Sequence, residues 1–156
     1  MEEKKKAKVG AVICEYNPLH QGHRFQIREI RQLIGEEGVI LSLMSGDFVQ
    51  RGEPALYSKF ARAEAACRCG ADLVIELPLP WALSSAEGFA RGAVGLLGAL
   101  GATHLSFGSE AGETGPLEEL AGLLVTPEIN EEIKAVLAQD ASLSYAAARQ
   151  KAKQRY

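Results

Sequence analysis

This sequence has few cysteines, no long apolar run and only a small net charge. The 156 residues include three cysteines, an odd number that argues against a disulfide framework. No apolar run approaches the roughly 18 residues that a membrane-spanning helix needs. The charged start, residues 1–6, is not followed by the apolar segment of a secretion signal. These absences lead us to expect a reduced, cytoplasmic protein with no membrane segment.

The charge is spread unevenly along the chain. The formal net charge is −3 at pH 7, with a small positive excess in residues 1–70, a strong negative excess in residues 71–148 and a basic final segment. The overall charge therefore gives no sign of a nucleic-acid partner, although the first half could present a basic face. With 47% hydrophobic and 24% charged residues, the composition is that of an ordinary globular domain, and the length suits one core.

Apolar, β-branched runs alternate with longer segments of helical periodicity. The runs predict strands at residues 8–14, 39–44, 72–77 and 103–107, and the periodic segments predict helices at residues 22–34, 58–68 and 84–100. Because the strands are nearly continuous apolar runs, we expect a parallel sheet that is covered on both faces. The alternation indicates an α/β fold with right-handed crossovers and a doubly wound sheet. Gly35, Gly70 and Gly101 fall where these helices should end, so we expect them to supply left-handed caps.

The pattern changes after residue 110. Pro116 and Pro127 stand where the first turn of a helix tolerates a missing N–H, and no strand pattern separates the helices that follow. We expect an α/β core over residues 8–110 and a helical extension over residues 111–156. The final basic stretch has no stop signal, so we expect the helical extension to be truncated.

The segment with the clearest chemistry is residues 15–23, which follows the first predicted strand and opens the first predicted helix. Helix N-termini expose unpaired N–H groups and a partial positive charge, which favour a phosphate. His20 and His23 are three residues apart, so both imidazoles can face one side of the first turn and donate hydrogen bonds to a phosphate. Gly22 leaves room for a base or sugar. The alternative interpretation, two histidines in a surface loop, is disfavoured by the strand before and the helix after.

Residues 20–23 resemble the His-x-Gly-His motif of nucleotidyltransferases and class I aminoacyl-tRNA synthetases. Further segments resemble the tRNA(Met) cytidine acetate ligase family, in order and over essentially the whole chain: residues 15–23, 44–55, 58–62, 70–78 and 107–110. The resemblance implies a Rossmann-like, doubly wound parallel sheet of the nucleotidyltransferase type, with a C-terminal helical extension.

The resemblance also implies an activity. Enzymes of this family use ATP to convert acetate to acetyl-adenylate and then acetylate N4 of the wobble cytidine of elongator tRNA(Met). The partners that the resemblance implies are ATP with Mg²⁺, acetate and tRNA(Met). By motif position, His20 and His23 would be catalytic and hold the phosphates, and Gly108 would approach the adenosine. The residues that would line the ATP site are Val12, Ile13, Cys14, Glu15, Tyr16, Asn17, Pro18, Leu19, His20, Gln21, Gly22, His23, Arg24 and Phe25.

The chain departs from the family pattern in three residues and in length. Leu19, Gln21 and Phe60 stand where an aromatic residue, Asn and Trp are usual, and none of the three changes removes a group that the chemistry needs. Family members continue well beyond residue 156 into a second nucleotide-contacting region, so we expect little turnover from this chain alone. Two alternatives remain: an adenylyltransferase acting on a small phosphorylated metabolite, and a non-catalytic domain that binds nucleotide or tRNA.

A polar cluster follows the second predicted strand. Gln50, Arg51, Lys59 and Arg62 are candidates for binding acetate, triphosphate or tRNA phosphate, and Lys59 and Arg62 share one predicted helical face. A set of salt bridges between loop and helix explains the same residues equally well. Glu76 ends the third predicted strand, where we expect it to bond nearby backbone N–H groups.

The sequence offers no convincing metal site. Cys67 and Cys69 are two residues apart on a predicted helix, whereas zinc sites favour a Cys-x-x-Cys spacing. Cys14 lies in the first predicted strand, where we expect a small buried side chain. No carboxylate is recognisable as a dedicated Mg²⁺ ligand, so any Mg²⁺ would enter with ATP.

Overall fold

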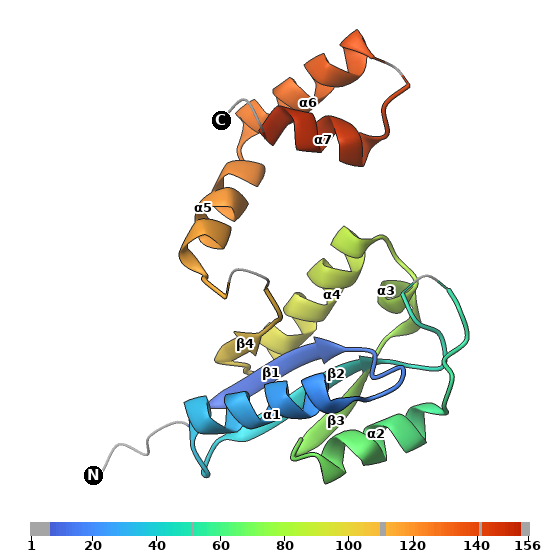
Figure 1. The fold of residues 1–156 in the computed structure, drawn as a ribbon, viewed down its shortest axis with the longest axis vertical. Helices are drawn as coiled ribbons and strands as arrows, with labels where there is room; N and C mark the ends of the chain where they lie inside the picture. The colour runs from blue at the N-terminus through green and yellow to red at the C-terminus, as the bar shows by residue number, and fades with distance from the viewer. Residues whose placement is uncertain (1–6, 51, 110–111, 141, 154–156) are drawn as a thin grey trace. The chain divides into compact units, whose positions relative to one another are not determined.

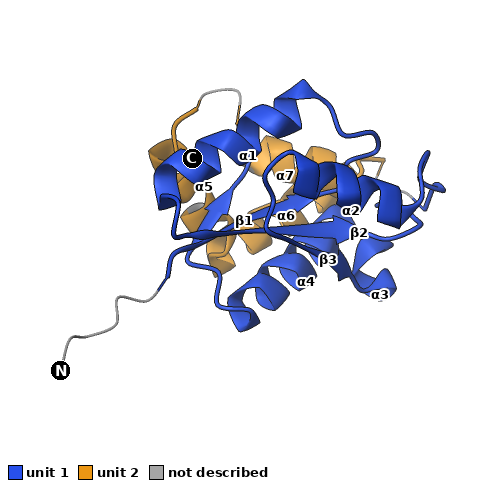
Figure 2. Ribbon diagram, turned by 90° about the horizontal axis from the view of Figure 1, so that it is seen from below, with its two compact units in different colours: residues 1–107 blue, residues 108–156 orange. Residues whose placement is uncertain are grey.

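The computed structural model describes residues 7–50, 52–109, 112–140 and 142–153. The chain forms two compact units that divide between Phe107 and Gly108, whereas we expected the boundary after residue 110. Figure 2 colours the first unit blue and the second orange.

The first unit is built on a four-stranded, fully parallel sheet. Its strands are β1 (Val9–Cys14), β2 (Val39–Ser45), β3 (Leu73–Leu77) and β4 (His104–Ser106). Their spatial order is β3-β2-β1-β4, so the chain builds outward from β1 to β3 and then returns to the other side of β1. This topology confirms the predicted doubly wound α/β sheet.

Helices cover both faces of this sheet (Figure 1). On one face, α1 (Gln21–Ile34) and α2 (Lys59–Arg68) enclose a core that includes Val12, Ile27, Ile30, Ile40, Met44 and Ala66. On the other face, α3 (Leu79–Ala82) and α4 (Ala86–Ala99) enclose a core of Ala11, Leu41, Leu43, Leu77, Ala82, Ala93 and Leu97. Successive strand residues point to opposite faces, and both faces are buried, which explains why the strands read as continuous apolar runs.

The predicted helix ends are confirmed at three glycines. Gly35, Gly70 and Gly101 follow α1, α2 and α4 and have φ values of 82°, 110° and 80°. These left-handed conformations are strained for residues with a Cβ.

The short helix α3 was not predicted. It begins directly after Pro78, and Pro80 occupies its first turn, where a missing N–H costs nothing. Its Trp81 packs directly against Gly92 of α4, where an added Cβ would collide with the indole ring. The pair of prolines was the available signal, but a single turn is too short to show helical periodicity.

The second unit is helical, as predicted. It contains α5 (Gly115–Leu124), α6 (Pro127–Gln139) and α7 (Tyr145–Lys153). The helices α6 and α7 pack together around Ile129, Ile133, Val136, Ala148 and Ala152. Across both units, none of the helices in the described ranges is long and apolar enough to span a membrane.

Candidate nucleotide-binding site

The sheet changes winding direction at β1, which lies between β2 and β4. In open α/β sheets, ligands bind outside the carboxyl ends of the strands at such a point. A cleft of about 420 Å³ opens there, between the loop after β1, the first turn of α1, the loop after β2 and one side chain of α4. Its lining residues are Ile13, Cys14, Glu15, Tyr16, Asn17, Pro18, His20, His23, Gln50 and Phe89.

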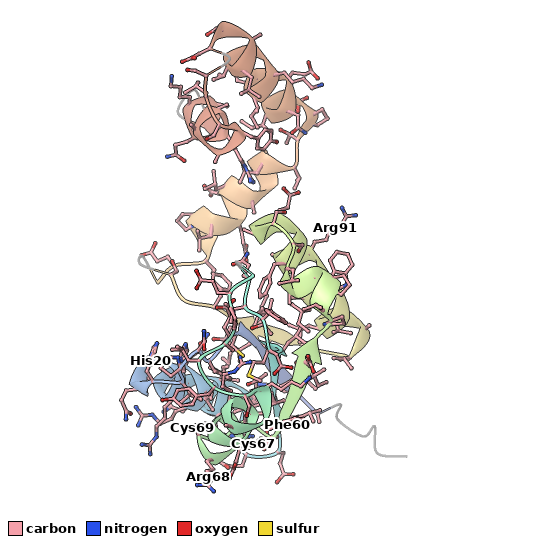
Figure 3. All side chains as sticks on the ribbon, turned by 90° about the vertical axis from the view of Figure 1, so that its right-hand side faces the viewer. His20, Phe60, Cys67, Arg68, Cys69 and Arg91 are labelled. Atoms are coloured by element: carbon pink, nitrogen blue, oxygen red, sulfur yellow. The ribbon has the colours of Figure 1, made fainter. Side chains whose placement is uncertain are left out.

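Two imidazoles form one wall of the cleft. His20 is the N-cap of α1, and its Nδ1 accepts a hydrogen bond from the backbone N–H of Gly22 at 3.1 Å. Nδ1 of His23 accepts from the backbone N–H of His20 at 3.2 Å. The two rings stack with their centroids 3.7 Å apart, at an angle of 26°. Figure 3 labels His20 at this first turn. Among the described residues, none bonds Nε2 of either ring, so both atoms are free to meet a ligand.

His23 is held as a neutral imidazole. Partial burial lowers its pKa below the ordinary value of 6.5, and the neighbouring His20 lowers it further. The first turn of α1 contains no acidic residue to oppose a bound anion. A phosphate in the cleft would therefore meet the positive end of the helix dipole together with two imidazole nitrogens.

Gly22 makes a close contact that the sequence did not predict. We expected the missing side chain to leave room for a base or sugar. In the structure a Cβ at Gly22 would lie 3.0 Å from Cε1 and 3.1 Å from Nδ1 of His20. The glycine therefore makes room for the imidazole that caps its own helix.

Tyr16, which lines the cleft, makes a buried polar contact with β2. The Tyr16 side chain is 1% exposed, and its hydroxyl lies 3.0 Å from Oγ of Ser42 in β2. Burial raises the pKa of Tyr16 well above its ordinary value and raises the pKa of Cys14 to about 12. Cys14 is buried, as predicted, and its thiol lies 3.5 Å from the carbonyl of Leu43. Both groups are neutral at pH 7, so neither repels an anion.

Two side chains join the loop after β1 to the loop after β2. Oε1 of Glu15 accepts from the backbone N–H of Gln50 at 2.8 Å, and Oδ1 of Asn17 accepts from that of Leu56 at 2.7 Å. These bonds bring Gln50 to the cleft from a distant part of the sequence. Because the carboxylate of Glu15 is used in this way, it acts as a structural acceptor in the wall.

Arg62 is placed beneath the site rather than in it. Its side chain is 2% exposed and donates to the carbonyls of Tyr57 at 3.0 Å, Glu15 at 2.5 Å and Ser45 at 3.2 Å, and also to that of Gly46. The guanidinium therefore ties the carboxyl ends of β1 and β2 to the start of α2. The structure does not turn Arg62 outward with Lys59 toward a shared anion.

Lys59 instead lies between two carboxylates. Its Nζ is 2.8 Å from Oε2 of Glu76 and 3.5 Å from Oδ2 of Asp47, and the hydrogen bond to Glu76 is the main cause of its raised pKa. Glu76 therefore pairs with a side chain, which corrects our expectation that it bonds backbone N–H groups. For Lys59 this geometry matches the salt-bridge alternative, whereas Arg62 bonds backbone carbonyls instead.

Several predicted ATP-site residues lie away from the cleft. Val12 and Leu19 pack in the core on the α1 side, and Gln21, Arg24 and Phe25 are exposed on α1. Gly108 begins the second unit, two residues beyond the end of β4, and remains a predicted adenosine contact. Arg51 lies outside the described residues.

Phe89 was missed as a residue of the site. It reaches the cleft from α4, on the opposite face of the sheet from α1. In the sequence it reads as one more apolar residue of a helix, and no local signal separates it from the core.

The described part of the chain holds no group of three or more His, Cys, Asp or Glu side chains arranged for a metal ion. Cys67 is exposed near the end of α2, and Cys69 is its partly buried C-cap; Figure 3 labels both. Of the described residues that line the cleft, Glu15 is the one with an acidic side chain, and it is already bonded to a backbone N–H.

The topology and the site together define a class. A doubly wound parallel sheet whose first loop presents two imidazoles at a helix N-terminus is the arrangement of an α/β nucleotide-binding protein. The chain matches the family model described as HIGH Nucleotidyl Transferase over residues 7–156, and it belongs to that family.

Relatives within the family are similar in sequence and structure. The tRNA(Met) cytidine acetate ligase of Syntrophotalea carbinolica is 55% identical over 113 residues, covering 72% of this chain and 27% of that protein. The protein of the same name from Acetivibrio thermocellus is 46% identical over 152 residues, covering 96% and 36%. The crystal structure of Thermotoga maritima TmcAL bound with alpha-thio ATP has a TM-score of 0.87 at 41% identity, covering 96% of this chain and 36% of that chain. The chain thus spans about a third of the length of these relatives.

Proposed function

We propose that this chain is the nucleotide-binding part of an ATP-dependent tRNA(Met) cytidine acetate ligase. Its substrates are ATP, acetate and the wobble cytidine of elongator tRNA(Met), and it acts in the cytoplasm, where tRNA is modified. The proposal rests on the two stacked imidazoles at the start of α1, which line the cleft and whose Nε2 atoms bond no described residue. The names of the relatives and the nucleotide bound to Thermotoga maritima TmcAL support it.

The proposed chemistry has two steps. A carboxylate oxygen of acetate attacks the α-phosphorus of ATP, the bond from that phosphorus to the bridging oxygen breaks, and pyrophosphate leaves. N4 of the cytidine then attacks the acetyl carbon, AMP leaves, and the nitrogen loses a proton. In the first step His20 and His23 donate hydrogen bonds to phosphate oxygens on which negative charge builds.

Among the described residues, Glu15 is the one carboxylate that lines the cleft, and its Oε1 is already used by a backbone N–H. We therefore expect Mg²⁺ to enter with the triphosphate oxygens and waters as its main ligands. The described residues supply the donors for the phosphates and the apolar wall formed by Ile13 and Phe89.

Product analysis tests the proposal. The protein is incubated with ATP and labelled acetate, with or without unmodified tRNA, and the products are separated by thin-layer chromatography and mass spectrometry. Acetyl-AMP that depends on acetate, followed by N4-acetylcytidine in tRNA, is the expected result for the protein in its longest natural form. For the 156-residue chain alone we expect weak ATP binding and little acetylation. A dinucleotide formed from a phosphorylated metabolite would overturn the proposal in favour of an adenylyltransferase.

A further inference from the structure

The bonds of the imidazole pair decide where its hydrogens lie. A neutral imidazole carries one hydrogen, and a ring nitrogen that accepts a hydrogen bond cannot hold it. Nδ1 of His20 and Nδ1 of His23 both accept from backbone N–H groups of the first turn. Each hydrogen therefore lies on Nε2, and the cleft receives two N–H donors without a positive charge on either ring.

Tyr16 connects this pair to the sheet. Its ring meets that of His23 edge-on, with the centroids 5.1 Å apart and the planes at 75°, and His23 in turn stacks on His20. The Tyr16 hydroxyl is bonded to Ser42 of β2, and its backbone has a φ of 48°, in the left-handed region that few residues other than glycine adopt. Such a conformation persists only where the surroundings fix it. The position of Tyr16 is therefore set by the core.

Partial burial, together with the neighbouring His20, favours the neutral form of His23. Of the titratable groups in the cleft wall, Cys14 and Tyr16 are neutral because burial raises the pKa of each. The Glu15 carboxylate is bonded to a backbone N–H, and Arg62 beneath it is bonded to four carbonyls. A proton on Nδ1 of His23 would break the bond that this atom accepts and would add a charge beside a stacked imidazole.

We propose that Tyr16 is a positioning residue that keeps His20 and His23 as two neutral Nε2–H donors facing the cleft. Donors that are fixed before the ligand arrives need no reorganisation when charge builds on a phosphate. The inference rests on the proposed function only for the identity of the ligand, because the bonds that fix the tautomers are formed without it.

The test is ¹⁵N NMR of the imidazoles in the 156-residue chain, without nucleotide, over a range of pH. In the wild type we expect both rings in the Nε2–H form and a pKa for His23 below 6.5. Tyr16→Met fills the space of the ring but offers no aromatic edge to His23. We expect this variant to populate the Nδ1–H tautomer of His23 as well and to raise the pKa of His23 toward 6.5. Tyr16→Phe keeps the ring and should preserve the Nε2–H form. Tyr57→Leu, at a tyrosine that is 59% exposed, is the matched control and should change neither property.

Two results would overturn the inference. One is an Nδ1–H tautomer on either histidine of the wild type, which is decisive whether or not a variant folds. The other is a Tyr16→Met chain that is folded by circular dichroism and keeps the wild-type tautomers and His23 titration. ATP binding is measured separately by calorimetry on the same samples. A chain that binds no ATP counts against the proposed function and leaves the tautomer assignment standing.

Discussion

The imidazoles of His20 and His23 serve the helix and the cleft at the same time. Each Nδ1 satisfies a backbone N–H at the start of α1, where the helix itself provides no acceptor. Each Nε2 remains for the ligand. A substitution at either residue should therefore lower both stability, through the lost cap, and the rate of phosphate chemistry, through the lost donor.

We predict that His20→Ala or His23→Ala lowers acetyl-adenylate formation at least about a hundredfold, the scale of one preorganised donor. The assay measures labelled acetyl-AMP made by the full-length protein. His104→Ala is the control, because His104 lies in β4, pairs with Thr103 and does not line the cleft. Wild-type rates in both cleft variants would refute the catalytic assignment.

Gly22→Ala should weaken nucleotide binding about tenfold, equivalent to one good hydrogen bond. The new Cβ would press on the ring of His20 and move it from its position over the first turn. Gly95→Ala is the matched control, because Gly95 is also in a helix but has open space where the Cβ would go. Titration calorimetry with ATP measures both, and equal affinities would show that the ring tolerates the methyl group.

At the scale of the elements, the site is held together by the bonds between two loops. The loops after β1 and β2 are joined by Glu15 and Asn17 of the first loop, which bond backbone N–H groups of the second. Arg62 of α2 bonds backbone carbonyls at the ends of both strands. The buried guanidinium satisfies carbonyls at the ends of both strands, where the sheet ladder stops. The shape of the cleft therefore depends on α2, although no α2 residue lines it.

Arg62→Met should lower the free energy of unfolding by about 3 kcal/mol or more, because it leaves several buried carbonyls without a donor. Arg62→Lys should recover only part of the loss, since one ammonium cannot reach all four carbonyls. Arg68→Met on the same helix is the control and should change stability by less than about 0.5 kcal/mol, because its pair with Glu64 is exposed. Urea unfolding followed by circular dichroism measures all three. Equal losses at Arg62 and Arg68 would contradict the structural role of Arg62.

For the whole molecule, each of the two units has its own core, and the cleft belongs to the first. The sheet, its covering helices and both imidazoles lie within residues 1–107. Because the folded first unit lowers the pKa of His23, the pH dependence of its stability should include a contribution from this residue.

We predict that the free energy of unfolding falls as the pH is lowered through about 6.5. The folded state holds His23 at a lowered pKa, whereas the unfolded chain takes up the proton near the ordinary value of 6.5. The unfolded state therefore binds more protons below that pH and is favoured. Urea unfolding between pH 5 and pH 8 measures the slope, and His23→Gln should make it shallower. An unchanged slope would show that His23 titrates alike in both states.

The sequence by itself determined most of the secondary structure, the parallel sheet and the place of the turn proposed to bind phosphate. Continuous apolar runs follow from burial on both faces, and the glycines at 35, 70 and 101 follow from the left-handed backbone that ends a helix. Both requirements act within a short segment of the chain, so neighbouring residues in the sequence show them. The motif at residues 20–23 was visible for the same reason.

Only the tertiary structure decided which side chains meet. It brought Gln50 and Phe89 to the cleft and directed Arg62 to carbonyls of two other segments. It also showed that an added Cβ at Gly22 would press on the ring of His20. Such contacts join residues that are far apart in the chain or depend on a ring's orientation, so they cannot be predicted from composition and residue spacing. The physical reason is that burial and hydrogen bonding depend on which groups lie close together in the folded chain, and the arrangement of the strands and helices decides that.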